Sequence, residues 1–205
     1  MPSPLVHSVH FYDHDAALIS RLHNVVQSSL DGGGSVLIVA SEGHRLQLQS
    51  ALKQSGKSVP DGRLQMFDAR ETLSKFMVGD RPSDSRFAET VGALLGNARE
   101  TTRNPRRSVT VFGEMVAVLW EEGNKTGALE LERLWNDTLH QRNFHLHCAY
   151  PRWILQDKSD NLMIKAICDE HSSVLGHSNR LRPSVAHSGI EKRVNSLSLC
   201  PNPVH

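Results

Sequence analysis

The chain has 205 residues, with 23 Lys and Arg against 22 Asp and Glu, which gives a formal net charge of +1. This balance excludes a general electrostatic attraction to nucleic acid, anionic lipid or acidic substrates. The length suits one domain of about 150 to 200 residues with a substantial core, plus some excess at one end. The sequence has no run of 18 apolar residues and no N-terminal basic and apolar leader, so we expect a cytoplasmic protein without a membrane segment.

Apolar runs alternate with amphipathic stretches along most of the chain. The runs predict strands, and the amphipathic stretches predict helices. The expected strands are 5–12, 36–40, 63–68, 108–113 and 144–150, and the expected helices are 16–30, 42–52, 69–77, 86–102, 115–122, 126–141 and 161–170. This alternation is typical of an α/β fold with strands buried on both faces. We predict a three-layer α/β/α sandwich with a mainly parallel sheet of five or more strands.

The last part of the chain has a different character. The segment 171–175 could return to the sheet, whereas residues 176–205 are rich in Ser, Pro, Asn, His and Arg and lack a sustained apolar period. Such a composition does not offset the entropy lost on ordering. The sequence therefore predicts one domain over residues 5–175 and a flexible tail over 176–205.

The most informative segment is an apolar strand that runs into Glu114 and then into an amphipathic helix. Open α/β sheets bind ligands at the carboxyl ends of their strands. Glu114 could therefore orient a ligand or act as a general base, or it could cap the following helix or pair with an arginine. For Met115, core filling is favoured over ligand contact.

Further candidates follow from their positions at strand ends. His10, Tyr12 and Asp13 lie at the end of the first strand, where they could supply polar groups to an otherwise apolar pocket. A buried histidine bonded to a backbone carbonyl is the alternative for His10. Trp120 could wall the same pocket, although packing between helix and sheet also explains it.

The fifth strand contributes two more candidates. Cys148 and Tyr150 are expected to share one face of the sheet by alternation, and His171 could close the site from the end of the last helix. A buried apolar role for the cysteine and a helix-dipole role for the histidine are the alternatives. Glu132 and Asn136 lie on the helix expected over 126–141, and their side chains are expected to be solvated. The twelve histidines and three cysteines show neither an HExxH nor a CxxC motif, so no metal site and no cofactor are predicted.

Several motifs together resemble one family. They are His10–Asp13, Gly32–Ala40, Gly62–Leu64, Asp68–Met77, Phe112–Asn124, Leu131–Asn136, Cys148–Pro151 and Ile167–His171. These motifs resemble the methanogen/methylotroph sensory domain, MEDS, from about Val6 to about Leu175. The resemblance implies a bacterial or archaeal signal-sensing domain, found alone or joined to DNA-binding or histidine-kinase modules, that binds small hydrocarbon derivatives. It also implies a degenerate relative of the RecA-like ATPase fold.

The sequence lacks the residues that nucleotide hydrolysis by such a fold requires. No GxxxxGK[ST] loop is present, and residues 12–15 place Asp13 and Asp15 where phosphates would bind. We therefore expect a RecA-like or Rossmann-like fold without a P-loop, and no enzymatic activity.

The leading hypothesis is a non-catalytic sensor. A small, largely apolar signal would bind near His10, Tyr12, Glu114 and Tyr150 and regulate a separate protein, either a histidine kinase or a transcription factor. A homodimer is compatible with this role, and direct binding to nucleic acid is not expected. One alternative is a ligand-independent interaction module, which would have an exposed apolar surface, for example on the 129–139 helix, and no enclosed pocket. The other is an enzyme, a cryptic ATPase or a hydrolase using Cys148 or Glu114.

Overall fold

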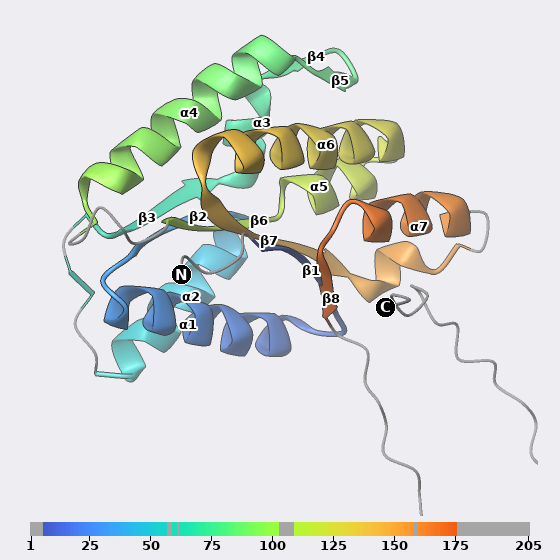
Figure 1. Cartoon of the computed structure of the whole chain (residues 1–205). Helices are drawn as coiled ribbons and strands as arrows, with labels where there is room; N and C mark the ends of the chain where they lie inside the picture. Colours follow the sequence, from blue (N-terminus) through green and yellow to red (C-terminus); the bar gives the residue numbers. More distant parts are fainter. Residues whose placement is uncertain (1–5, 57–58, 61, 103–108, 158–159, 176–205) are drawn as a thin grey trace, which may run out of the picture.

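The computed structural model describes residues 6–56, 59–60, 62–102, 109–157 and 160–175, so the predicted tail lies outside the described residues (Figure 1). Six parallel strands form one sheet in the order β3-β2-β6-β7-β1-β8. The strands are β1 (His7–Tyr12), β2 (Ser35–Ala40), β3 (Leu64–Asp68), β6 (Val109–Gly113), β7 (Phe144–Pro151) and β8 (Ser173–Leu175). The prediction of a mainly parallel sheet is confirmed.

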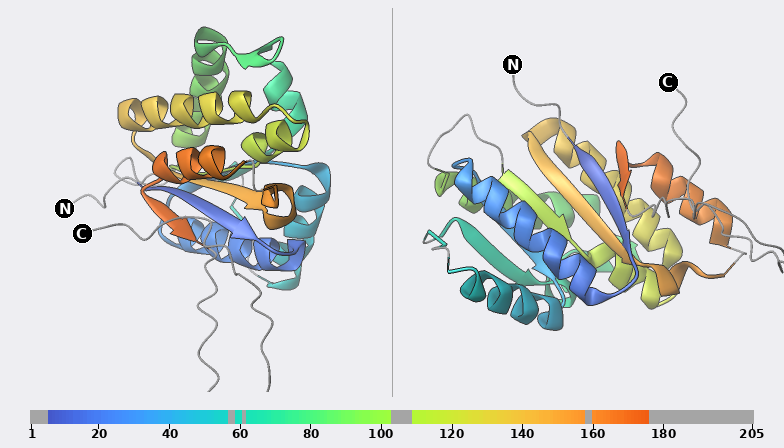
Figure 2. Two further views of the ribbon diagram at one scale, coloured as in Figure 1. Left: turned by 90° about the vertical axis from the view of Figure 1, so that its right-hand side faces the viewer. Right: turned by 90° about the horizontal axis from the view of Figure 1, so that it is seen from below.

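Helices cover both faces of this sheet, which confirms the three-layer α/β/α sandwich (Figures 1 and 2). On one face lie α1 (Asp15–Asp31) and α2 (Glu42–Gln54). On the other lie α3 (Ala69–Ser74), α4 (Asp84–Glu100), α5 (Met115–Glu121), α6 (Lys125–Arg142) and α7 (Asn161–Asp169). A short 3-10 helix, η1 (Arg152–Leu155), follows β7.

The structure adds a hairpin that the sequence did not predict. The predicted helix over 69–77 ends at Ser74, and β4 (Met77–Val78) pairs with β5 (Arg81–Pro82). Gly79 adopts a φ of 60°, a backbone conformation that glycine adopts without steric cost and that allows this turn. A two-residue strand is too short to produce a detectable alternation in sequence.

The central strands are buried on both sides, as their unbroken apolar runs predict. All six residues of β2 are buried: Val36, Ile38 and Ala40 pack toward α1 and α2, and Leu37 and Val39 pack toward the opposite helix layer. The core therefore consists of two apolar clusters, one on each side of the sheet.

The segment after α7 returns to the sheet, as the sequence suggested. β8 pairs with β1 in register Ser8 with Ser173, and the Ser172 hydroxyl donates to the His7 carbonyl at 2.9 Å. This arrangement places the last described residues beside the first. Within the described ranges, no helix is long and apolar enough to cross a membrane.

Candidate functional site

At the carboxyl ends of the strands, Glu114 is joined to the helices of one face. Its side chain accepts a hydrogen bond from the Ser41 backbone N–H at 3.0 Å, and His44 Nδ1 lies 2.5 Å from the other carboxylate oxygen. His44 Nε2 lies 3.3 Å from Asp15 Oδ1. We call Asp15, His44 and Glu114 the strand-end network. Within the described part of the chain, the Glu114 carboxylate neither caps α5 nor pairs with an arginine, so the two structural roles suggested as alternatives to a site role are not observed.

The charges of the strand-end network favour a protonated histidine. Burial lowers the pKa of His44, but the hydrogen bond and charge of Glu114, together with those of Asp15, raise it to about 9. His44 is therefore an imidazolium near neutral pH, held between two carboxylates. It connects the start of α1, which contains Asp15, to the start of α2 and the end of β6.

An aromatic group adjoins the strand-end network. The Tyr12 ring meets His44 edge-on at 6.1 Å between centroids and meets Trp153 edge-on at 5.7 Å. Tyr12 is buried, whereas Trp153, on η1, is 49% exposed. Trp153 was not predicted as a site residue, since only the fold places η1 beside the end of β1.

His10 and Asp13 lie at the edge of this aromatic group. The His10 ring is 6.2 Å from that of Tyr12, and burial together with the charges of Arg21 and Arg152 lowers the pKa of His10 to about 4. Asp13 Oδ1 lies 3.3 Å from Arg152 Nε. His10 is thus neutral near pH 7, and Asp13 pairs with a cation that borders the site.

The remaining polar candidates lie on the opposite face of the sheet. Phe11 is the register partner of Tyr150, so Tyr12 faces α1 and α2 while Cys148 and Tyr150 face α5, α6 and α7. The single site expected near Tyr12, Glu114 and Tyr150 is therefore wrong. Alternation along β1 and β7 divides the predicted residues between two sites.

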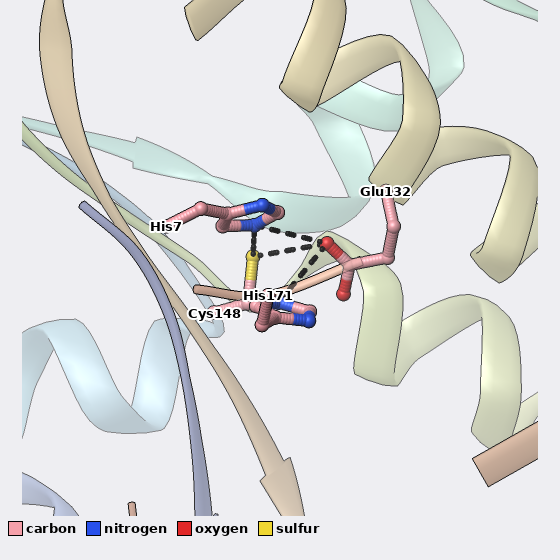
Figure 3. A group of neighbouring side chains, drawn as sticks. All are labelled: His7, Glu132, Cys148 and His171. Carbon is pink, nitrogen blue, oxygen red and sulfur yellow. Dashed lines mark hydrogen bonds and ion pairs between the residues drawn. The ribbon is translucent and has the colours of Figure 1, made fainter. Parts of the chain in front are cut away.

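The second site is centred on Glu132 of α6 and is shown in Figure 3. Glu132 Oε2 lies 3.3 Å from Cys148 Sγ, 3.3 Å from His7 Nε2 and 3.5 Å from His171 Nε2. The Tyr150 hydroxyl donates to Oε1 at 2.9 Å. We call His7, Glu132, Cys148 and His171 the buried cluster.

Glu132 is completely buried, so the expectation of a solvated side chain is wrong. It occupies the same helical stripe as Ala128 and Trp135, four residues before it and three after it, and both of these are buried. That spacing is visible in the sequence and could have identified Glu132 as an inward carboxylate. No sequence pattern could have identified His7, because its place in the cluster depends on the pairing of β1 with β7.

The buried cluster contains strongly perturbed ionisable groups. Burial raises the pKa of Glu132, but His171, His7 and the Tyr150 hydroxyl lower it overall. Burial lowers the pKa of His7, but Glu132 raises it above its ordinary value. Burial and then the Glu132 charge raise the pKa values of Cys148 and Tyr150. Without a bound cation, Glu132 is therefore a carboxylate that receives hydrogen bonds from a neutral thiol and a neutral phenol.

Met115 and Trp120 pack in the apolar core on the same side of the sheet as the buried cluster. Met115 and Trp120 are both buried, and the Trp120 ring meets that of Tyr150 edge-on at 6.1 Å. The Trp120 Nε1–H donates to the Ile154 carbonyl at 3.0 Å. Both side chains thus have the packing role that the sequence offered as an alternative to ligand contact.

Two open grooves lie away from the predicted residues. One, of about 550 Å³, separates α1 from the amino-terminal parts of β6 and β7, and its polar lining includes Arg21, Asn24, Thr110, His145 and His147. The other, of about 620 Å³, is lined by Gln49, Leu52, Lys53, Val59, Leu64 and Met66. Neither lining includes a residue of the strand-end network or the buried cluster.

Comparison with known proteins identifies a family for this chain. No curated protein matches the chain. Residues 6–171 match the family described as MEDS, the MEthanogen/methylotroph, DcmR Sensory domain. This match covers most of the chain and includes the strand-end network and the buried cluster. The chain therefore belongs to the MEDS family, a family of sensory domains, and its role is signal sensing.

Proposed function

We propose that the protein senses a small, largely apolar, hydrocarbon-derived molecule at the carboxyl edge of the sheet. The site would lie between Tyr12, Trp153 and the strand-end network. The observation that carries this proposal is the contact of the half-exposed Trp153 with the buried Tyr12, whose ring in turn meets His44. Sensing would be non-catalytic and cytoplasmic.

The chemistry of this edge fits an apolar molecule with a polar end. When a ligand covers the exposed indole surface of Trp153, each Å² of apolar area buried contributes about 25 cal/mol to the free energy of binding. Both His44 nitrogens already face carboxylates, so the polar groups beside that surface are the acceptor oxygens of Glu114 and Asp15. Apolar walls with a few placed polar groups are typical of small-molecule sites.

The size of such a ligand limits its affinity. The best small ligands gain about 1.5 kcal/mol per non-hydrogen atom, so a haloalkane with three such atoms reaches about 4.5 kcal/mol. This free energy corresponds to a Kd on the order of 0.5 mM. Screening must therefore extend to millimolar concentrations of ligand.

A signal bound here can change how the helices of one face are held. His44 links Asp15 at the start of α1 to Glu114 at the end of β6. A ligand shifts a conformational equilibrium only if it binds the two states with different affinity. We propose that ligand contact at His44 alters the position of α1 and α2, and that a separate histidine kinase or transcription factor responds to this change.

The structure provides no specific support for a ligand-independent interaction module. For that alternative we expected an exposed apolar surface on the 129–139 helix. In the structure, however, Leu131, Trp135 and Leu139 of α6 are buried. The exposed large apolar side chains among the described residues, Leu46, Val78, Trp153 and Leu162, lie on four different elements or turns.

Titration with haloalkanes, short alcohols, short acids and nucleotides tests the proposal. Trp120 and Trp135 are buried, so a change in exposed indole fluorescence reports on Trp153. We expect a saturable change with an apolar ligand, lost in Trp153→Phe, and no turnover of ATP or esters. If no ligand tested changes the fluorescence at millimolar concentration, or if the protein hydrolyses ATP, the proposed function is contradicted.

A further inference from the structure

The buried cluster brings together four donor atoms from distant parts of the chain. His7, His171, Cys148 and Glu132 each offer one donor atom, a ring nitrogen, a sulfur or a carboxylate oxygen, and these four atoms lie within 4.8 Å of one another. They come from the start of β1, the segment after α7, the middle of β7 and the middle of α6. Figure 3 shows these side chains turned toward one another.

Four of the six distances between these atoms match those between ligands of one metal ion. In a tetrahedral site with metal–ligand bonds of about 2.0 to 2.3 Å, neighbouring ligand atoms lie about 3.3 to 3.8 Å apart. Glu132 Oε2 is 3.3 Å from His7 Nε2, 3.3 Å from Cys148 Sγ and 3.5 Å from His171 Nε2. His7 Nε2 is 3.4 Å from Cys148 Sγ.

The His7 ring nitrogen that faces away from the cluster, Nδ1, already has a hydrogen-bond partner. Asn136 Nδ2 donates to the Glu170 carbonyl and carboxylate, at 2.9 Å each, which fixes the orientation of its amide. Asn136 Oδ1 therefore accepts a hydrogen bond from His7 Nδ1–H at 2.7 Å. In the neutral imidazole, Nε2 then presents its lone pair to the cluster. Metal-binding histidines are oriented by such contacts at the other ring nitrogen.

His171 is held in the same way. Its Nδ1–H donates to the Ile167 carbonyl at 2.6 Å, which leaves the lone pair of Nε2 directed toward the Glu132 carboxylate. This Nε2 is buried and makes no hydrogen bond. A buried lone pair facing a carboxylate oxygen is unfavourable unless a proton or a metal ion lies between them, and burial lowers the pKa of His171 and so disfavours its protonated form.

We propose that the buried cluster binds one transition-metal ion, with Zn²⁺ as the best fit, through His7, Glu132, Cys148 and His171. Imidazole and thiolate donors favour Zn²⁺ over Mg²⁺ or Ca²⁺. The Cys148 thiol loses its proton to solvent when it binds the ion, and any proton on His7 Nε2 is also released. The thiolate and the Glu132 carboxylate then balance the two positive charges.

The proposed site is structural in character and independent of the ligand site on the other face. Four protein ligands fill a tetrahedral coordination sphere, and all four side chains are buried. The ion would join α6 and β7 to both ends of the described chain, at His7 and His171. Metal binding therefore stabilises the attachment of β8 to β1.

The first test is cobalt substitution of the full, untagged chain. We expect metal-free protein to bind about one equivalent of Co²⁺ with the spectrum of tetrahedral cobalt and a thiolate-to-cobalt charge-transfer band. Zn²⁺ should displace the cobalt and raise the midpoint of thermal unfolding. Absence of the charge-transfer band, or a spectrum of octahedral cobalt on surface histidines, would overturn the proposal.

Matched variants identify the ligands. Cys148→Ser should abolish the charge-transfer band, and Glu132→Gln or His171→Gln should remove the stabilisation by Zn²⁺. The controls are Glu130→Gln on the same helix and His145→Gln on β7, which lie outside the cluster and should leave both signals unchanged. A band that persists in Cys148→Ser, or equal losses in the controls, would contradict the assignment.

Asn136→Ala tests the positioning role separately. Because it leaves all four ligands in place, the tetrahedral spectrum should remain while metal affinity falls by about 10 to 100-fold. An unchanged affinity would show that His7 is not oriented through Asn136. If metal binding fails in every form, the fluorescence test of the Trp153 site still stands, because the two sites share no residue.

Discussion

Glu114 and Glu132 are both buried carboxylates, but their surroundings give them different roles. Glu114 is 4% exposed and meets one imidazolium, which it shares with the more exposed Asp15. Glu132 is fully buried and meets His7 and His171. A buried charge is tolerated only when it is paired and hydrogen-bonded. Glu114 therefore holds a charged histidine at the sheet edge, whereas Glu132 organises a closed polar cluster.

Stability should depend on the protonation of His44. Its pKa is raised from 6.5 to about 9, so its stabilising contribution is complete below about pH 6.5 and is lost as the pH rises through about 9. The shift corresponds to a contribution on the order of 3 kcal/mol. Urea unfolding between pH 6 and pH 10 measures this loss.

Glu114→Gln removes the larger of the two causes that raise the pKa of His44, the other being Asp15. In this variant the pKa of His44 should fall, as followed by NMR of its imidazole, and the alkaline loss of stability should shrink. Glu89→Gln, at an exposed position on α4, is the control and should behave like the parent protein. An unchanged His44 titration in Glu114→Gln would contradict the strand-end network.

The two tyrosines give a matched pair at the residue scale. Tyr150→Phe removes a donor from the buried Glu132 carboxylate and should lower the free energy of unfolding by about 1 to 3 kcal/mol. Among the described residues, the Tyr12 hydroxyl makes no hydrogen bond, so Tyr12→Phe should cost less than about 0.5 kcal/mol. Equal effects in chemical denaturation would show that the Tyr150 bond does not stabilise the fold.

Some of the candidate site could be predicted from the sequence. The position of Glu114 at a strand end followed from one apolar run, and the shared face of Cys148 and Tyr150 followed from alternation. The placement of Tyr12 and Tyr150 on opposite faces of the sheet depended on the register of β1 with β7, which a single sequence does not reveal. Trp153 was missed for a similar reason, since η1 has no periodic signal.

At the scale of elements, the turn from α1 to β2 is held by a buried cation. The Arg63 guanidinium, 5% exposed, donates to the carbonyls of Leu30 and Gly34. Gly33 adopts a φ of 83°, which glycine tolerates at the end of a helix. Arg63 thus neutralises the carboxyl end of α1 and ties it to the start of β3.

Loss of this cation should be costly. Arg63→Gln leaves buried carbonyls without donors, so the free energy of unfolding should fall on the order of 3 kcal/mol. Arg70→Gln, which removes an exposed ion pair with Glu122, should change it by less than about 1 kcal/mol. Urea denaturation of both variants is the measurement, and similar losses would contradict the structural role of Arg63.

Most helices and strands were predictable because their apolar periods are long and uninterrupted. The predicted strand 36–40 and helix 42–52 correspond to β2 and α2, and Ser41 caps that helix through the His44 N–H. The β4–β5 hairpin was not predictable, because its strands are only two residues long and depend on contacts made in the folded chain.

At the scale of the whole molecule, the sheet separates two polar sites. The strand-end network lies with α1 and α2, whereas the buried cluster lies with α6 and the segment after α7. Each site links elements that are distant in sequence: Asp15 with Glu114 through His44, and His7 with His171 through Glu132. We therefore expect the ligand response and the metal response to be separable by mutation.

Mapping ligand-induced NMR shifts on the full chain tests the proposed sensor site most directly. Addition of a haloalkane or short alcohol at millimolar concentration should shift the Trp153 indole signal and the amides of Tyr12, His44 and Glu114. The indole signals of Trp120 and Trp135 should move little, because both side chains are buried. Shifts confined to the groove at Arg21 and His147, or no saturable shifts at all, would contradict sensing at the carboxyl edge of the sheet.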